Sequence, residues 1–441
     1  MEKSLLNNIL GRLGIESLTE MQTESAKAYK SGADTVILAP TGTGKTIAYL
    51  LPIIDDVDTR ADYPQAIVIV PSRELAIQIN SVLKQMKTEV RSCCCYGGRP
   101  AMDEHRTFMG IHPHVIIGTP GRLNDHLEKQ NIDATNIKTV VLDEFDKCLE
   151  FGFQDEMKTV ISKLPNIKQR MLLSATNREQ IPNFVGTTNR VVINYLNTDE
   201  NDQERVKVHV VNSYAKDKLD TLLDLLLSRE QESSIVFLNY REAVERVFNF
   251  LHSKHLNCEM FHGGMEQDKR EKAIYKFSNG TSNILVSTDL SARGLDIPDI
   301  DNIIHYHLPL NEEAYIHRNG RTARWEAKGN CYIIINDEET LPEYIGEKVD
   351  IYYIPKNLPE PKPSKWSTLY FGKGKKDKIS KGDILGFLCK QGELGKEDIG
   401  KIDVRDYYSF AAVSRLKVKG LIEKIKGLKI KGQKTIIQEA K

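Results

Sequence analysis

The chain has 441 residues, of which 40% are hydrophobic and 28% are charged. This length exceeds one hydrophobic core and predicts about two to four domains of an ordinary globular protein. The net charge is zero, but residues 362–441 hold 20 Lys and Arg against 9 Asp and Glu. A basic C-terminal segment behind an acidic body is typical of proteins that bind a polyanion, although a solvated lysine-rich face gives the same charge.

The cysteines and the hydropathy of the chain argue against disulfide-linked, zinc-binding and membrane-spanning proteins. The seven cysteines are odd in number, and no CxxC pair occurs. This pattern argues against a disulfide framework and a zinc site, and no apolar stretch approaches the length of a transmembrane helix. We therefore expect a cytoplasmic protein. The adjacent cysteines 93–95 are predicted to lie in a buried strand.

Short apolar runs recur along the chain with helical patterns between them. The first five lie at 35–39, 66–70, 114–118, 139–142 and 170–174. Continuous rather than alternating apolar runs predict a buried parallel sheet with helices on both faces. A polar segment at 194–207 predicts a linker, and a second series follows at 208–211, 234–238, 283–288, 302–309 and 331–336. The sequence therefore predicts two α/β domains in tandem, at 1–197 and 198–355.

A proline-rich stretch ends the second domain and predicts another linker at 356–365. The remaining residues, 366–441, predict a strand at 367–372, a helix at 382–392, two strands in 399–413, a helix at 414–427 and a strand at 428–438. This β-α-β-β-α-β order is that of an RNA-recognition motif. Tyr408 and Phe410 alternate onto one sheet face, where they either stack on bases or pack in a core. Candidate RNA contacts in this domain are Lys429, Lys431 and Lys434.

A phosphate-binding loop is predicted in "TVILAPTGTGKT", residues 35–46. The segment combines a strand, a glycine-rich loop and a helix that begins near Lys45. Gly42 and Gly44 allow backbone N–H groups to converge on phosphate oxygens at the helix N-terminus. Lys45 can reach the β- and γ-phosphates, and the Thr46 hydroxyl can bind Mg²⁺. We therefore expect ATP and Mg²⁺ as cofactors.

The acidic stretch "DEFD", residues 143–146, directly follows a predicted strand. Asp143 is expected at the sheet edge where α/β proteins bind ligands, and it would hold Mg²⁺ there. Glu144 is placed to orient and deprotonate the attacking water. Asp146 is expected to make a structural or signalling contact. The bulky Phe145 raises the question of where its ring is accommodated.

Over about residues 1–355, the chain resembles the DEAD-box ATP-dependent RNA helicases, with "DEFD" where that family has D-E-A-D. The similar segments of the first domain are "LTEMQ", "APTGTGKT", "PSRELAIQ", "GG", "TPGR" and "SAT". Those of the second domain are "SIVFLNYRE", "HGGMEQDKR", "STDLSARGLD" and "HRNGRTAR". The resemblance implies two RecA-like parallel-sheet domains, followed here by the small α+β RRM-like domain.

The resemblance also implies roles for individual residues. The nucleotide would be bound by Gln22, Ala39, Pro40, Thr41, Gly42, Thr43, Gly44, Lys45, Thr46 and Asp296. Catalysis would fall to Lys45, Asp143, Glu144, Arg321 and Arg324, of which the two arginines reach the γ-phosphate when the domains close. Ser174 and Thr176 would contact Asp146 and couple hydrolysis to unwinding. RNA would be bound by Arg73, Gly98, Thr119, Arg122, Thr288 and Arg293. The chain departs from the family pattern at Phe145, Asn319, Ala323 and Trp325.

The last domain resembles the C-terminal domain of DbpA-type bacterial helicases in "DIGKIDVRD" and "KIKGQK". This implies binding of structured ribosomal RNA and a role in large-subunit assembly. The leading hypothesis is a monomeric, RNA-stimulated ATPase that locally unwinds short RNA duplexes and binds neither DNA nor membranes. An ATP-gated RNA clamp or chaperone without productive unwinding stays open because of Phe145 and Ala323. A DNA translocase is disfavoured by the RRM-like domain.

Overall fold

The computed structural model describes residues 2–40, 42–98, 100–176, 181–187, 189–196, 206–289, 300–322, 329–346 and 349–440. Their contacts divide the chain into two compact units. The first unit holds the described residues up to 196. The second unit holds those from 206 onward, including the C-terminal domain. Among the described residues, the helices are all too short or too polar to cross a lipid bilayer.

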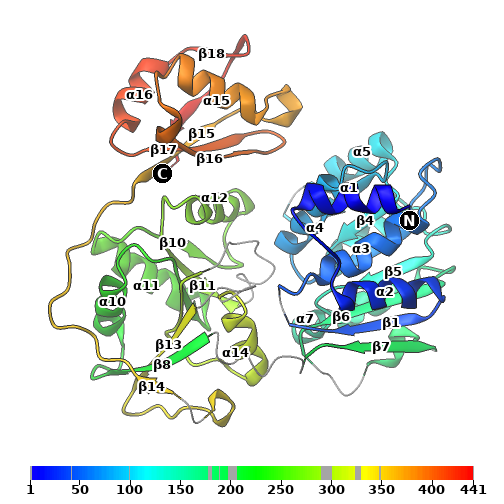
Figure 1. The fold of residues 1–441 in the computed structure, drawn as a ribbon, viewed down its shortest axis with the longest axis horizontal. Helices are drawn as coiled ribbons and strands as arrows, with labels where there is room; N and C mark the ends of the chain where they lie inside the picture. Colours follow the sequence, from blue (N-terminus) through cyan, green and yellow to red (C-terminus); the bar gives the residue numbers. More distant parts are fainter. Residues whose placement is uncertain are drawn as a thin grey trace. The chain divides into compact units, whose positions relative to one another are not determined.

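The first unit is built on a seven-stranded sheet of order β3-β4-β2-β5-β6-β1-β7, in which every pairing is parallel (Figure 1). Its strands are β1 (Asp34–Leu38), β2 (Ala66–Ile69), β3 (Ser92–Cys95), β4 (Val115–Gly118), β5 (Thr139–Leu142), β6 (Gln169–Ser174) and β7 (Arg190–Asn194). The predicted parallel sheet and the predicted cysteine-containing strand are thus confirmed.

Helices cover both faces of this sheet. They are α1 (Lys3–Leu13), α2 (Glu20–Lys30), α3 (Lys45–Asp56), α4 (Arg73–Gln85), α5 (Ala101–Ile111), α6 (Pro120–Glu128), α7 (Phe145–Glu150) and α8 (Gln154–Ser162), with a 3₁₀ turn at Asn183–Val185. In β5, Val141 faces the core cluster beneath α2, α3 and α4, whereas Val140 and Leu142 face the cluster beneath α6, α7 and α8. Burial on both faces explains why the strands are apolar throughout rather than alternating.

The second unit contains another seven-stranded parallel sheet, of order β10-β11-β9-β12-β13-β8-β14. The strands are β8 (Val206–Ser213), β9 (Ser234–Leu238), β10 (Cys258–Phe261), β11 (Ile284–Thr288), β12 (Asn302–His305), β13 (Gly329–Asn336) and β14 (Asp350–Ile351). The helices are α10 (Leu219–Ser228), α11 (Arg241–Ser253), α12 (Gln267–Ser278) and α14 (Glu312–Asn319), with a 3₁₀ turn at Glu343–Ile345. The second predicted series of strands is therefore also present.

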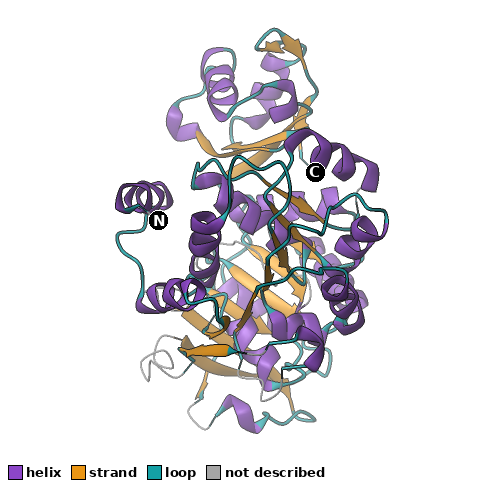
Figure 2. Ribbon diagram, turned by 90° about the vertical axis from the view of Figure 1, so that its right-hand side faces the viewer, coloured by secondary structure: helices purple, strands orange, loops and turns teal. Residues whose placement is uncertain are grey.

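The C-terminal domain, called the tail below, has four antiparallel strands in the order β16-β17-β15-β20. Its elements are β15 (Trp366–Phe371), α15 (Lys381–Lys390), β16 (Ile399–Val404), β17 (Ser409–Ser414), α16 (Val418–Ile425) and β20 (Ile437–Glu439), with 3₁₀ turns at Lys375–Asp377 and Lys396–Asp398. Both helices pack on one side of the sheet (Figure 2).

The single strand predicted at 428–438 is wrong. This segment forms a small hairpin of β18 (Lys429–Ile430) and β19 (Gln433–Lys434), and only then β20. Lys431 and Gly432 both have positive φ, at 51° and 77°. Two consecutive left-handed residues reverse the chain in a tight hairpin, so the segment cannot run on as one strand.

Candidate functional site

The predicted motifs gather at the carboxyl edge of the first sheet, in two neighbouring groups. The glycine-rich loop, "DEFD" and "SAT" follow or end β1, β5 and β6, which are adjacent in the sheet. The predicted RNA motifs follow β2, β3 and β4, which are adjacent on the other side of β5. Ligands of parallel α/β sheets bind at this edge. The strand order therefore places "DEFD" at the border between the two groups.

The glycine-rich loop folds around the Lys45 side chain. Gly42 and Gly44 have φ of 87° and 83°, a backbone conformation that side chains with a Cβ strongly disfavour. The Lys45 ammonium donates hydrogen bonds to the carbonyl oxygens of Ala39 at 2.5 Å and Pro40 at 2.7 Å. The loop therefore holds a positive charge at the N-terminus of α3, the arrangement that suits a phosphate.

Gln22 supports this loop from α2. Its backbone and side chain form a capping box with Thr19, in which its Oε1 accepts from the Thr19 N–H at 3.0 Å. Its Nε2 donates to the Gly44 carbonyl at 3.2 Å. A Cβ at position 44 would lie only 2.4 Å from that Nε2. The structure thus assigns Gln22 a contact with the loop itself, and its reading of adenine stays a prediction.

Asp143 is a buried carboxylate beside the loop. Its Oδ1 accepts from the Glu144 N–H at 2.9 Å, and its Oδ2 accepts from the Tyr49 hydroxyl at 3.0 Å. Burial, reinforced by the nearby Glu144 carboxylate, raises the pKa of Asp143 to about 6, although Lys45 opposes this. The Thr46 hydroxyl interacts with Tyr49 on the same helix. Carboxylate and hydroxyl oxygens are ligands of divalent cations, so Asp143 and Thr46 are suited to bind one. The charge of a bound cation would favour the ionised form of the Asp143 carboxyl.

Glu144 has an unusual backbone and side-chain environment. Its φ of 48° places it in the left-handed region, just before α7. Such strain in a non-glycine residue costs about 1–2 kcal/mol and is concentrated at functional sites. Its Oε2 is buried without a hydrogen-bond partner among the residues that the structure describes. A buried acceptor of this kind suits a carboxylate that binds a water molecule.

The side chain of Phe145 lies in the core of the first unit. It is 3% exposed and belongs to the cluster that includes Leu38, Leu142 and Cys148. The ring is therefore accommodated in the apolar cluster that packs against α6, α7 and α8.

Asp146 and "SAT" are joined directly. The Thr176 hydroxyl donates to the Asp146 Oδ2 at 3.1 Å. The Ser174 hydroxyl donates to the Thr176 carbonyl at 2.6 Å and accepts from the Thr176 N–H at 3.1 Å. These bonds connect the first turn of α7 to the end of β6.

Arg73 and Gly98 lie together in the second group of motifs. Gly98 has φ of 92°, and a Cβ there would lie 2.4 Å from the Arg73 Nη1. Arg73 begins α4, after its N-cap Ser72. The positive φ favours glycine here, and any larger residue would displace the guanidinium.

Arg122 is held by a buried carboxylate that the sequence did not single out. Its Nε lies 3.6 Å from the Glu104 Oε2, which is also 2.9 Å from the His126 Nε2. The other oxygen of Glu104 accepts from the Tyr96 N–H at 3.0 Å. Thr119 is the N-cap of α6, which carries Arg122. The carboxylate thus fixes the start of this helix, and no local spacing indicates it.

In the second unit, Thr288 is buried at the end of β11, and the next residue forms an ion pair that the sequence did not indicate. Both oxygens of Asp289 accept from Arg318, at 2.5 and 2.7 Å. Arg318 is 1% exposed and also donates to the His307 carbonyl and to the Asn239 Oδ1, each at 2.7 Å. A bidentate pair with further bonds fixes β11 to α14.

Asn319 completes this network. The Arg318 Nη1 donates to the His305 Nδ1 at 3.2 Å, so the proton of the neutral imidazole lies on Nε2. That Nε2–H donates to the Asn319 Oδ1 at 3.1 Å. Burial, together with Arg318, lowers the pKa of His305 to about 3. Arg318 and Asn319 thus hold His305 in one tautomer, and Arg321 follows two residues later, after Gly320.

In the tail, Lys429 and Lys434 are exposed on the β18–β19 hairpin. The Lys431 ammonium instead donates to the Lys378 carbonyl at 3.0 Å and lies 3.3 Å from an oxygen of Asp383. Within the described part of the chain, the side chains of Lys429 and Lys434 form no hydrogen bond or ion pair, so the hairpin presents two of the three predicted contacts. The predicted site residues Thr41, Arg293, Asp296 and Arg324, and the departures Ala323 and Trp325, lie outside the described residues.

Comparison with known families matches three segments of the chain. Residues 19–184 match the model of the DEAD/DEAH box helicase domain, and residues 217–326 match the helicase conserved C-terminal domain. Residues 368–439 match the DbpA RNA binding domain.

Similar proteins cover nearly the whole chain. The ATP-dependent RNA helicase DbpA of Escherichia coli is 32% identical over 438 residues, which span 96% of this chain and 94% of that protein. The protein of the same name from Bacillus subtilis is 28% identical, with 97% and 96% coverage. Among solved structures, S. cerevisiae Dbp5 bound to RNA and ADP BeF3 aligns with a TM-score of 0.71 and 26% identity, over 80% of this chain and 94% of that one. Mss116 bound to ssRNA and UDP-BeF aligns with a TM-score of 0.68 and 28% identity, over 77% and 74%.

Proposed function

The chain belongs to the DEAD-box ATP-dependent RNA helicases, and we propose that it couples ATP hydrolysis to the local opening of short RNA duplexes. The observation that carries this proposal is the position of β5 in the first sheet. "DEFD" follows this strand, between the phosphate-binding motifs on one side and the predicted RNA motifs on the other. The sites of ATP hydrolysis and of RNA binding would therefore both border the segment 143–146.

In the proposed reaction, Lys45 neutralises the phosphates, and Thr46 and Asp143 would hold Mg²⁺. When bound, Mg²⁺ lowers the cost of negative charge on the transferred phosphoryl group. Glu144 accepts the proton of the attacking water. Its free buried oxygen and its strained backbone support this role. Arg321 supplies positive charge from the second unit, so neither unit alone carries the full set of groups.

RNA would be bound through its backbone by both units. Arg73 and Arg122 are guanidinium groups near the carboxyl ends of β2 and β4, and Thr288 ends β11. Such contacts position a strand without reading its sequence. The bond between Thr176 and Asp146 supports a mechanical link from the cleaved phosphate to the bound strand.

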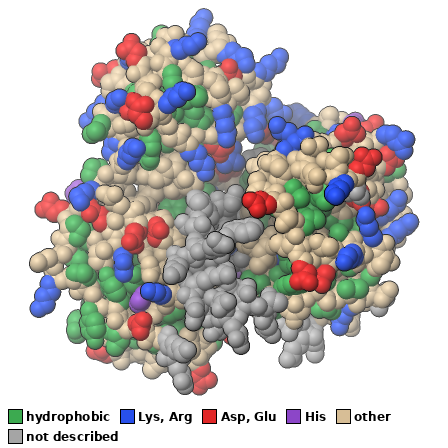
Figure 3. All heavy atoms as spheres, in the orientation of Figure 1, with side chains coloured by type: hydrophobic (Ala, Val, Ile, Leu, Met, Phe, Trp, Pro, Cys, Tyr) green, Lys and Arg blue, Asp and Glu red, His purple; other side chains and the backbone are tan. Residues whose placement is uncertain are grey.

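The tail would select the substrate. Its excess of Lys and Arg supports binding to a polyanion, and Figure 3 shows these side chains spread over the visible face of the tail. Its similarity to the DbpA RNA binding domain supports RNA as the ligand of the tail, and we propose that this RNA is a structured ribosomal RNA. We further propose a monomeric, cytoplasmic protein that acts in assembly of the large ribosomal subunit.

An ATP-gated clamp that never unwinds was suggested by the bulky Phe145 and by Ala323. Ala323 lies outside the described residues. The Phe145 side chain lies in the core of the first unit, so it gives no reason to expect a loss of unwinding. A helicase is therefore the function that the site supports best.

The test compares the wild type with Glu144→Gln and with Glu128→Gln, a surface control whose carboxylate is exposed and paired with Lys163. Glu144→Gln should bind ATP and RNA normally but lose at least about 100-fold in RNA-stimulated turnover and unwind no duplex. The control should retain both activities. Normal turnover of Glu144→Gln would remove this residue from its role, and equal stimulation by DNA and RNA oligomers would contradict an RNA helicase.

A further inference from the structure

Three aromatic side chains share one face of the tail sheet. Tyr370 comes from β15, Phe410 from β17, and Tyr408 directly precedes β17. Their ring centroids lie 5.3–5.9 Å apart. The two tail helices cover the opposite face. In an RNA-recognition motif, this exposed face is where aromatic rings stack on bases.

In this chain, α12 of the second helicase domain covers that face. Tyr275 of α12 stacks on Phe410 with a centroid distance of 4.8 Å and an interplanar angle of 24°. Both side chains are only 3% exposed, and Ala440 completes the cluster. The ring face that a base would use is therefore already occupied by a tyrosine of the same chain.

Polar groups around the aromatic cluster are paired across the same contact. The Tyr408 hydroxyl donates to a carboxylate oxygen of Glu271, and the Tyr275 hydroxyl donates to the Lys401 carbonyl. The Lys401 ammonium donates to the Ser278 hydroxyl at 3.1 Å. The polar groups of α12 and of the tail sheet therefore satisfy one another. A chance contact between two apolar surfaces would not be expected to show such pairing.

The loop after α12 extends the contact to β15. The Asn279 Nδ2 donates to the Thr368 hydroxyl at 2.9 Å, and the Thr281 hydroxyl lies 2.9 Å from the same oxygen. All three side chains are buried. A Cβ at Gly280 would lie 3.4 Å from the Trp366 ring. The start of the tail therefore fits closely against this loop.

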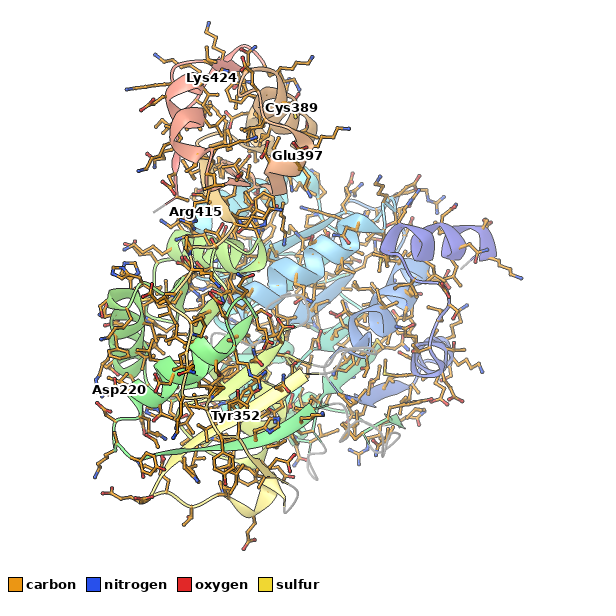
Figure 4. All side chains as sticks on the ribbon, turned by 60° about the vertical axis from the view of Figure 1, so that its left-hand side comes forward. Asp220, Tyr352, Cys389, Glu397, Arg415 and Lys424 are labelled. Carbon is orange, nitrogen blue, oxygen red and sulfur yellow. The ribbon has the colours of Figure 1, made fainter. Side chains whose placement is uncertain are left out.

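The last residues of the connecting segment are bonded to both domains. The Lys362 carbonyl accepts from the Asn257 Nδ2 at 2.8 Å, and the Lys362 ammonium lies 2.9 Å from a Glu230 oxygen. Two residues later, the Ser364 carbonyl and hydroxyl accept from Arg415 of the tail, each at 2.8 Å. Arg415 lies at the base of the tail, toward the second helicase domain (Figure 4).

We propose that the aromatic face of the tail sheet is a docking surface for α12 and that RNA bases do not stack on it. The tail then moves with the second helicase domain as one body. RNA held by the tail must use other surfaces, such as the hairpin with Lys429 and Lys434. Only this last consequence rests on the proposed RNA-binding function. The docking itself does not.

Hydroxyl-radical footprinting of the full-length protein, read by mass spectrometry, tests the docking without RNA. Tyr407 is 63% exposed and is the neighbour of Tyr408, so the two residues form an internal comparison of equal chemistry. We expect Tyr408, Phe410 and Tyr275 to be modified several-fold more slowly than Tyr407. Equal rates for Tyr407, Tyr408 and Phe410 would overturn the proposal.

Two variants should release the tail. Tyr275→Asp introduces a charge into the ring stack and should bring Tyr408 and Phe410 toward the rate of Tyr407. Thr368→Val keeps the side-chain volume, removes the hydroxyl at the contact and should raise the same rates less. The control is Tyr214→Asp, because Tyr214 is 99% exposed and should not alter the pattern. If Tyr275→Asp unfolds by circular dichroism, Thr368→Val decides, and an unchanged pattern in this variant counts against the proposal.

A second arm adds a saturating single-stranded oligouridylate to the wild type. The protection of Tyr275 and Phe410 should not change. If Tyr275 becomes modified while Phe410 stays protected, the RNA has displaced α12 from the sheet, and the proposal is wrong. If the protein binds no RNA at all, the proposed function fails, while the pattern without RNA still decides the docking.

Discussion

Replacing Asp143 with Asn should stabilise the nucleotide-free protein, although it removes a residue proposed to hold Mg²⁺. Burial raises the pKa of this carboxyl to about 6 from its ordinary value of 3.8. The folded state therefore binds the proton more tightly than the unfolded state does. Stability consequently falls as pH rises from about 4 through 6, and the ionised carboxylate costs free energy at neutral pH.

The size of the effect follows from the shift in pKa. A difference of about 2 units corresponds to roughly 3 kcal/mol at pH 7.5, as an upper limit. Asn keeps an acceptor for the Glu144 N–H, and the Tyr49 hydroxyl can rotate to accept from the new amide. Because the amide forms these two hydrogen bonds less well than the carboxylate, the net gain in the free energy of unfolding should be about 1–2 kcal/mol. For a domain of this size, that raises the melting temperature by about 3–6 °C.

Thermal unfolding of the first unit, without Mg²⁺ or nucleotide, measures this gain. At pH 4.5 the gain should disappear, because the carboxyl is then largely protonated in the folded protein and the remaining ionisation cost of about 1 kcal/mol is offset by the weaker bonds of Asn. The control is Asp133→Asn. Hydrogen bonds from Thr135 lower the pKa of Asp133, so this variant should gain nothing. A melting temperature of Asp143→Asn that falls at pH 7.5, or that rises equally at both pH values, would refute the reasoning.

Three further substitutions test other contacts. Thr176→Val removes the bond to the buried aspartate of α7 and should lower duplex unwinding about 10-fold in a strand-displacement assay, with RNA-stimulated ATPase less affected. Gly98→Ala combines a strained backbone with a clash against Arg73, so RNA affinity by fluorescence anisotropy should weaken about 10-fold while ATP affinity stays constant. Asn319→Leu leaves the His305 Nε2–H without its acceptor and should cost the second unit about 1–3 kcal/mol in urea unfolding. An unchanged value in any of these assays would contradict the corresponding assignment.

Much of the fold could be predicted because it depends on local patterns. The continuous apolar runs predicted parallel strands, and the glycine-rich loop and "DEFD" were located at strand ends. The order of strands in a sheet is not local, since it is set by crossovers between distant segments. The division of the motifs on either side of β5 therefore appeared only in the structure. The hairpin at Lys431 and Gly432 was missed because a lysine in the left-handed region gives no turn signal.

The supporting residues of the site were harder to predict than the motifs themselves. Tyr49 meets Asp143 across 94 positions of sequence, and Arg318 meets Asn239 across 79. No spacing rule connects such pairs. The tail aromatics show the same limit, because alternation placed Tyr408 and Phe410 on one face but could not indicate that Tyr275 would cover it.

Arg321→Gln tests whether groups from both units act on one nucleotide, as proposed above. Single-turnover hydrolysis of ATP should be measured with saturating RNA, alongside the affinity for a non-hydrolysable ATP analogue. We expect Arg321→Gln to bind the nucleotide with unchanged affinity and to hydrolyse ATP at least about 100-fold more slowly than the wild type. Hydrolysis at the wild-type rate would show that the second unit contributes no catalytic charge through this residue.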